Sequence, residues 1–226
     1  VTGLSFAGYA ASRIVGGPKS TLVMAAIGGA YSSTAITALL SHRLRNEDSG
    51  HGVLSAGIAL ATSISLARVL LLTAILAGFA FLPIMRLAGA AVLVGLVAGL
   101  VLLRDHTPAS DQPPSRPENP IAMVPALGFL VLVAIMAVAA RWAEARFGGG
   151  GTLALITTIG LFDVDAAIIT LGGFGPAKIS RETAGLALGG AVLTNLLLKI
   201  GVVVIYAGPN RGRRAIIALS ASVLAL

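Results

Sequence analysis

Long apolar stretches alternate with short polar connections along most of the chain. Several of these stretches reach the roughly 20 residues that an α-helix needs to cross a bilayer. The apolar segments cover residues 2–16, 20–41, 53–79, 84–103, 121–143, 152–174, 183–207 and 213–226. The first and last of them are short for complete spans. The pattern predicts an all-α, polytopic membrane protein with about seven or eight apolar segments.

Composition supports this class. Hydrophobic residues make up 56% of the 226 residues, charged residues 11%, and the mean hydropathy is +0.93. A soluble domain carries about 25% charged residues. The net charge of +7 comes from Lys and Arg side chains that lie mostly in short loops, where they set topology and meet anionic headgroups. No basic patch is interleaved with aromatic residues, so nucleic acid is not an expected partner.

Several kinds of chemistry find no support in the sequence. The chain has no cysteine, which excludes disulfides, thiolate metal sites and cysteine nucleophiles. No Ser/His/Asp arrangement suggests hydrolysis, and the glycine run at 148–151 lacks the lysine and the strand of a phosphate-binding loop. We therefore expect no enzyme activity and no cofactor.

One proline-rich connection divides the chain almost in half. It covers residues 104–120 and is typical of a solvated linker rather than a span. It predicts a first transmembrane half at 1–103 and a second at 121–226. The chain also begins at Val1 without an initiator methionine, so we expect that a preceding part has been removed.

The two halves show an internal two-fold repeat with an offset of about 131 residues. The matching pairs include Gly17 with Gly148, Gly29 with Gly160, Tyr31 with Phe162, Ser32 with Asp163, Thr34 with Asp165, Ser63 with Thr194, and Arg68 with Lys199. Such repeats build many transporters, with the site at the repeat interface near the membrane midplane. Four segments per half would give parallel repeats and an odd number inverted ones, and the sequence leaves both open.

The strongest candidate site residues are Asp163 and Asp165, which lie within an apolar segment. An ionisable group at membrane depth costs roughly 2.5–3.5 kcal/mol to insert, and such groups usually mark an ion or proton path. Residues two apart on a regular helix point in different directions. The two carboxylates therefore share a ligand, a metal ion included, only if the backbone unwinds. The alternative is a buried ion pair without a transport role.

Glycine precedes a cluster of oxygen-bearing side chains in both halves. Gly28 and Gly29 stand before Ser32, Ser33 and Thr34, as Gly160 stands before the two aspartates. Glycine weakens a helix, and Ser or Asp can bond freed backbone amides, so we predict broken helices near the midplane. Hydroxyls at helix contacts are the alternative reading for the serines and the threonine.

Further polar groups within apolar segments complete the candidate pathway. Ser63, Thr194 and Asn195 supply oxygen atoms. Arg68 and Lys199 supply cations that we expect to pair with Asp163 or Asp165 across the repeat interface. The alternative for both cations is snorkelling, in which a long side chain reaches the membrane surface.

Three motifs resemble one known family. They are Gly-Ala-Tyr-Ser-Ser-Thr-Ala-Ile-Thr at 29–37, Gly-Leu-Phe-Asp-Val-Asp at 160–165 and Ser-Phe-Ala-Gly-Tyr at 5–9. The family is the multispanning domain of unknown function found C-terminal to the MgtC/SapB domain in bacterial membrane proteins. The resemblance implies a multi-pass protein of the bacterial inner membrane, with an MgtC/SapB-type domain before Val1. The run Ala-Ala-Ile-Ile-Thr at 166–170 departs from the family pattern by being longer.

The sequence is compatible with three functions. The first is a channel or secondary transporter for a cation or proton, because hard cations prefer oxygen ligands such as carboxylates and hydroxyls. The second is an anion channel that uses Arg68, Lys199 and helix N-termini. The third is a membrane regulator or scaffold that transports nothing. The expected partners are an inorganic ion, the lipid bilayer and a second copy of the chain, since two-fold dimers are the commonest oligomers.

Overall fold

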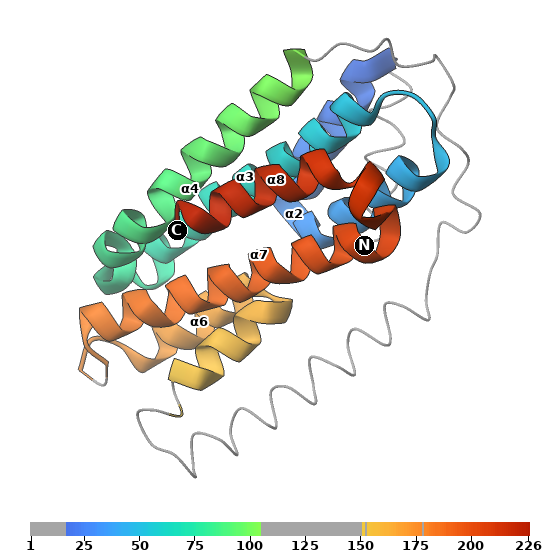
Figure 1. Ribbon diagram of the computed structural model, residues 1–226. Helices are drawn as coiled ribbons and strands as arrows, with labels where there is room; N and C mark the ends of the chain where they lie inside the picture. The colour runs from blue at the N-terminus through green and yellow to red at the C-terminus, as the bar shows by residue number, and fades with distance from the viewer. Residues whose placement is uncertain (1–16, 105–150, 152, 178) are drawn as a thin grey trace. The chain divides into compact units, whose positions relative to one another are not determined.

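Helices account for nearly all of the described structure (Figure 1). The computed structural model describes residues 17–104, 151, 153–177 and 179–226. The predicted segments at 2–16 and 121–143, and the linker beyond Arg104, lie outside these residues. No strand occurs within the described residues, and the all-α prediction is confirmed.

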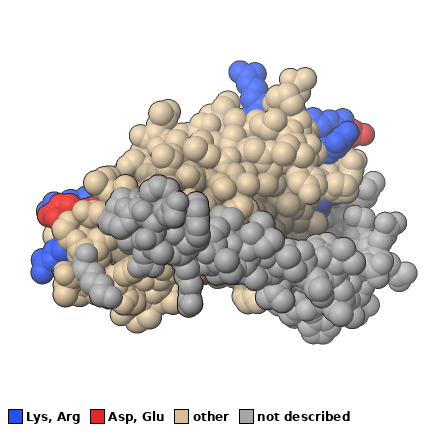
Figure 2. All heavy atoms as spheres, turned by 90° about the horizontal axis from the view of Figure 1, so that it is seen from below, with Lys and Arg blue, Asp and Glu red and all other residues tan. Residues whose placement is uncertain are grey.

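Four of the described helices are long and apolar enough to cross a membrane. In chain order the labelled helices are α2 (Gly17–Asn46), α3 (His51–Leu76), α4 (Gly78–Arg104), α6 (Val164–Phe174), α7 (Arg181–Arg211) and α8 (Arg213–Leu224). The four candidate spans are α2 from Thr21 onward, α3, α4 and α7. On the face shown in Figure 2, blue and red side chains are sparse among the tan residues, as a bilayer requires.

Two further apolar helices, Leu153–Phe162 and α6, share the predicted segment at 152–174. Only Asp163 separates them, with an extended backbone at φ −150° and ψ 107°. In α2, Ser32 is the one non-helical residue, with φ −146° and ψ 84°. The two breaks are 131 positions apart, which is the offset of the repeat. The prediction of a broken helix in each half is confirmed.

A third pair of positions follows the same offset. Helix α3 ends at Leu76, so Ala77 separates it from α4, and α7 has a kink at Gly208, where φ is 77°. Ala77 and Gly208 are again 131 positions apart. The repeat therefore extends over a broken helix, a long helix and the turn after it.

The glycines predicted to break the helices do not lie at the breaks, and that prediction was wrong. Gly28, Gly29 and Gly160 are helical, and the breaks follow three or four residues later. A methyl group on Gly29 would lie 2.6 Å from Cα of Ala61, and one on Gly160 would overlap Ala191. These two glycines therefore allow close helix packing, as small residues do in membranes.

The described residues form two compact units. Unit 1 holds residues 17–65, 92–104 and 199–224, and unit 2 holds 66–91, 151, 153–177, 179–198 and 225–226. Unit 1 contains the break at Ser32 and unit 2 the break at Asp163, and each unit takes residues from both halves of the chain. The predicted division of the chain at the proline-rich linker stays a prediction.

Unit 1 has a core of small and branched side chains from α2, α3, α7 and α8, and Figure 1 shows α8 alongside α3. The buried members are Ala25, Leu40, Leu44, Leu54, Ile58, Ala61, Val203, Ala207, Ala215 and Leu219. In lipid, helices associate by close packing rather than by the hydrophobic effect. The alanines allow that close approach between neighbouring helices.

Unit 2 is held together by glycine contacts of the same kind. A methyl group on Gly190 would lie 2.7 Å from the Thr157 hydroxyl, and one on Gly185 would overlap Pro83. In α6, a methyl group on Gly172 would lie 2.5 Å from the Leu76 carbonyl oxygen. The helices around the break before α6 are therefore closely packed.

Candidate functional site

Asp163 forms the break in unit 2 because its carboxylate replaces a helical carbonyl. Its Oδ1 accepts from the backbone N–H of Asp165 at 2.9 Å and of Ala166 at 3.5 Å. Asp163 is therefore the N-cap of α6, a position that short polar side chains favour. A negative charge there also interacts well with the positive end of the helix dipole.

The capping bond frees a carbonyl on the other side of the break. In a continuous helix the Asp165 N–H would bond the Leu161 carbonyl, but it bonds Asp163 instead. The Leu161 carbonyl oxygen accepts from the Asn195 side-chain amide at 3.4 Å. Asn195 is only 7% exposed, so it supplies a buried donor where the broken helix needs one.

Asp165 lies in the first turn of α6 and binds Arg68 of α3. The distance from Arg68 Nη2 to Asp165 Oδ2 is 2.8 Å, and the two side chains are 24% and 27% exposed. The contact lies within unit 2 and joins the first half of the chain to the second. The structure therefore forms one of the pairings predicted between the two aspartates and the two cations.

The second oxygen of the Asp165 carboxylate has no such partner. Oδ1 is buried, and the described residues provide no hydrogen bond to it. Leaving a buried polar atom unsatisfied costs about 1–3 kcal/mol, and more for a charged group. A cation bound to this oxygen or a water molecule that donates to it would remove that penalty. Protonation of the carboxyl group would also remove it, if the new O–H finds an acceptor.

Thr194 reinforces the packing beside the break, because its hydroxyl proton faces three backbone carbonyl oxygens. Its hydroxyl lies 3.1 Å from the Thr157 carbonyl and 3.0 Å from the carbonyls of Gly190 and Ala191. The bond to Thr157 joins α7 to the helix Leu153–Phe162. Thr194 therefore acts here as a structural contact within unit 2.

The candidate residues of the first half belong to unit 1. Ser32 repeats the role of Asp163, since its Oγ accepts from the Ala35 N–H at 3.4 Å. Ser33 is 5% exposed, and its carbonyl accepts from the Thr37 hydroxyl at 2.8 Å. Thr34 is partly buried, at the repeat position of Asp165. The break in unit 1 thus carries hydroxyls where the break in unit 2 carries carboxylates.

Ser63 and Lys199 are also buried in unit 1, each 1% exposed. The Ser63 hydroxyl donates to the Ala59 carbonyl at 3.0 Å, and a methyl group on Gly95 would overlap that hydroxyl. Lys199 stands at the repeat position of Arg68. Its burial disfavours snorkelling, which leaves a charged end group exposed.

The sequence patterns missed three buried hydroxyls of unit 1. The hydroxyls of Ser41, Ser55 and Thr62 have no hydrogen-bond partner among the described residues. Ser41 continues a line of hydroxyl residues, Ser33 and Thr37, at four-residue intervals along α2. That spacing places them on one helix face and was a signal available in the sequence.

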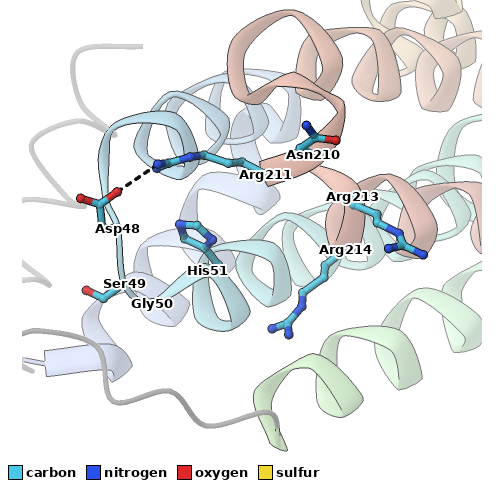
Figure 3. A pocket seen from close by; sticks show the side chains of 8 residues that line it. All are labelled: Asp48, Ser49, Gly50, His51, Asn210, Arg211, Arg213 and Arg214. Atoms are coloured by element: carbon cyan, nitrogen blue, oxygen red, sulfur yellow. Dashed lines mark hydrogen bonds and ion pairs between the residues drawn. The ribbon is translucent and has the colours of Figure 1, made fainter.

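The sequence patterns also missed a hollow at the ends of the unit 1 helices, shown in Figure 3. Its lining includes Arg211, Arg213 and Arg214, which the sequence alone suggested only as loop charges. No group of three or more His, Asp or Glu side chains that could hold a metal ion occurs in the described parts of the chain. The metal site predicted at Asp163 and Asp165 has two carboxylates and stays a prediction.

The helices and the broken segments define the class of protein, which is a polytopic α-helical membrane protein. Residues 1–207 match the model of a family described as "Domain of unknown function (DUF4010)", and the chain belongs to that family. Neither the curated proteins nor the solved structures provide a match. The description of the family names no substrate.

Proposed function

We propose that this chain is an integral membrane ion-transport protein, a channel or secondary transporter for a cation or a proton. The site is the broken helix of unit 2, where Asp165 binds the ion and Arg68 is the group that competes with it. The observation that carries the proposal is Asp165 Oδ1, which is buried and has no hydrogen-bond partner among the described residues, while Oδ2 binds Arg68.

The neighbouring groups suit such a step. A cation or proton on Asp165 weakens its attraction for Arg68, so the ion pair can break and form again as the ion passes. The helix break frees the Leu161 carbonyl oxygen from the helix, and the side-chain amide of Asn195 donates a hydrogen bond to it. Carboxylate, amide and carbonyl oxygens are the ligands that hard cations prefer. Asp163 keeps the break in place because it caps α6.

The test is ion flux in liposomes that contain the purified full chain, against a panel of cations, protons and anions. Asp165→Asn removes the charge that binds the ion, and we expect cation or proton flux to fall at least about tenfold, equivalent to about 1.4 kcal/mol. Glu182→Gln is the matched control, since Glu182 is an exposed carboxylate at the start of α7 in the same unit. Equal flux in Asp165→Asn and wild type would overturn the proposal.

A second candidate is an anion path, and the burial of Lys199 favours it. Lys199 is 1% exposed within an apolar helix, and an ionisable group at membrane depth usually marks an ion path. Anion flux that survives Asp165→Asn but is lost in Lys199→Ala or Arg68→Ala would support this function. A regulator or scaffold without transport is the third candidate, and absence of flux for every ion would support it.

The remaining parts of the proposal follow the resemblance and general tendencies of membrane proteins. We place the protein in the bacterial inner membrane, C-terminal to an MgtC/SapB-type domain, and acting without enzyme activity or a cofactor. We also propose a homodimer, because two-fold assemblies are the commonest. Cross-linking in native membranes, followed by mass measurement, tests the dimer.

A further inference from the structure

The described interior of unit 2 carries one more negative than positive side chain. Its partly buried charged residues are Asp163, Asp165 and Arg68. The other described charged side chains of the unit are exposed, and they are Arg86, Arg181 and Glu182. Charges at membrane depth are stable when they are paired, so a species with a single positive charge would balance the second carboxylate.

The two carboxylates differ in what their oxygen atoms bind. Oδ1 of Asp163 accepts from two backbone N–H groups of α6 and serves as the cap. Asp165 binds Arg68 through Oδ2, and its Oδ1 is buried and has no hydrogen-bond partner among the described residues. Oδ1 of Asp165 is therefore the atom at which the balancing positive charge acts.

Arg68 favours a proton over a metal ion at this atom. Its Nη2 lies 2.8 Å from the other oxygen of the same carboxylate. A metal ion on Oδ1 would keep its charge beside the guanidinium, and like charges repel more strongly in a partly buried site than in water. A proton forms an O–H bond and neutralises the carboxylate, so no second positive charge remains beside Arg68.

Resting on the proposed function, we propose that the species bound at Asp165 and carried by unit 2 is a proton, one for each carboxylate. A hydronium ion transfers its proton to Oδ1 and leaves as water, which converts the carboxylate to a carboxylic acid and weakens its attraction for Arg68. When the O–H bond breaks again, the proton passes to another water molecule, and the carboxylate and the ion pair are restored. Ionisable side chains within membrane helices serve as proton relays in this way.

The helix break also supplies acceptors for the new O–H group. Because Asp163 is not helical, the carbonyls of residues 160–162 lack the donors that a continuous helix would give them. Asn195 donates to one of these carbonyls, at Leu161. The other two carbonyls are acceptors in the same break, directly or through a water molecule, for the protonated form of Asp165.

The first experiment measures proton entry into liposomes that contain the full chain and enclose a pH-sensitive dye. A potassium gradient with valinomycin makes the lumen negative, and uptake of Na⁺ and Mg²⁺ is measured in parallel. We expect the lumen to acidify without uptake of either metal, and Asp165→Asn to slow acidification at least about tenfold. Glu182→Gln is the matched control, because it removes an exposed carboxylate of the same unit, and it should acidify at the wild-type rate.

Infrared spectroscopy of the purified chain in detergent detects the proton on Asp165 without any transport. A carboxylic acid has a C=O stretching band that a carboxylate lacks. At the pH of the acidic side in the flux assay, we expect a component of this band that is missing in Asp165→Asn and retained in Glu182→Gln. An excess of Na⁺ or Mg²⁺ should leave this component unchanged, since neither metal displaces the proton.

The outcomes separate this inference from the proposed function. Metal uptake that depends on Asp165 while the lumen pH stays constant would overturn the proton and leave the proposed function standing. No flux of any ion would overturn the proposed function, and loss of the infrared component as well would overturn proton binding at Asp165. If Asp165→Asn does not fold, Arg68→Gln/Asp165→Asn removes both charges of the pair and takes its place in both assays.

Discussion

Ser32 and Asp163 occupy the same position in the repeat, and each caps the helical segment that follows it. Ser32 accepts from the N–H three residues later, at Ala35, and Asp163 accepts from the equivalent N–H, at Ala166. Both residues have an extended backbone. Both halves therefore contain the helix break, but the capping group is a hydroxyl in the first half and a carboxylate in the second.

The cap at Asp163 should depend on an acceptor oxygen rather than on charge. Asp163→Asn retains such an oxygen, whereas Asp163→Ala leaves the N–H groups of Asp165 and Ala166 unsatisfied. We expect the alanine variant to lose about 1 kcal/mol of stability relative to the asparagine variant. Thermal unfolding in detergent measures the difference. Equal midpoints for the two variants would show that the carboxylate does not cap α6.

The ion pair between Arg68 and Asp165 should appear as coupling between the two residues. Arg68→Gln or Asp165→Asn alone leaves one charge in a part-buried site, while the double variant removes both charges. We expect the double variant to be more stable than the sum of the single effects predicts, by roughly 0.5–3 kcal/mol. Chemical unfolding of the four proteins measures this coupling energy. Additive effects would mean that the pair contributes nothing.

The close contact at Gly160 should make this position intolerant of a side chain. Gly160→Ala places a methyl group onto Ala191, so the helix Leu153–Phe162 has to move away from α7. Overpacking of this kind typically costs about 1–3 kcal/mol. Gly173→Ala is the control in α6, because no described atom lies within 4 Å of the new methyl group. We expect Gly173→Ala to be neutral or slightly stabilising in the same thermal assay.

Arg211 should matter more to the α2–α3 loop than its salt bridge suggests. Asp48 is 92% exposed, so Asp48→Asn removes an ion pair that contributes little in water. Arg211→Ala also removes the donors to the Arg45 and Glu47 carbonyls near the end of α2. We expect faster amide exchange in the α2–α3 loop for Arg211→Ala and near wild-type exchange for Asp48→Asn. Equal acceleration in both would assign the stabilisation to the salt bridge.

Much of the helical architecture could be read from the apolar segments, because a bilayer-spanning backbone must satisfy its own hydrogen bonds. The repeat offset also predicted a break in each half. It did not predict the residue at which each break occurs. Gly28, Gly29 and Gly160 were the natural candidates, since glycine weakens helices, but the capping side chains of Ser32 and Asp163 decided the position.

The candidate site could be predicted only as a set of residue types. The sequence contained Asp163, Asp165, Arg68 and Lys199 as charges within apolar segments. It did not indicate that Asp163 is a cap while Asp165 binds Arg68. The hollow at Arg213 and Arg214 was hidden in the same way, because its lining comes from two turns that are distant in the chain.

The sequence by itself determined the class of protein, the apolar helices and the repeat, since these depend on composition and on spacing along the chain. Tertiary structure decided how the polar groups are used. Whether a buried carboxylate caps a helix, pairs with a guanidinium or keeps an unsatisfied oxygen depends on which atoms lie within about 3 Å of it. Those neighbours come from segments far apart in the chain, as Arg68 and Asp165 do, and no local pattern encodes their distance.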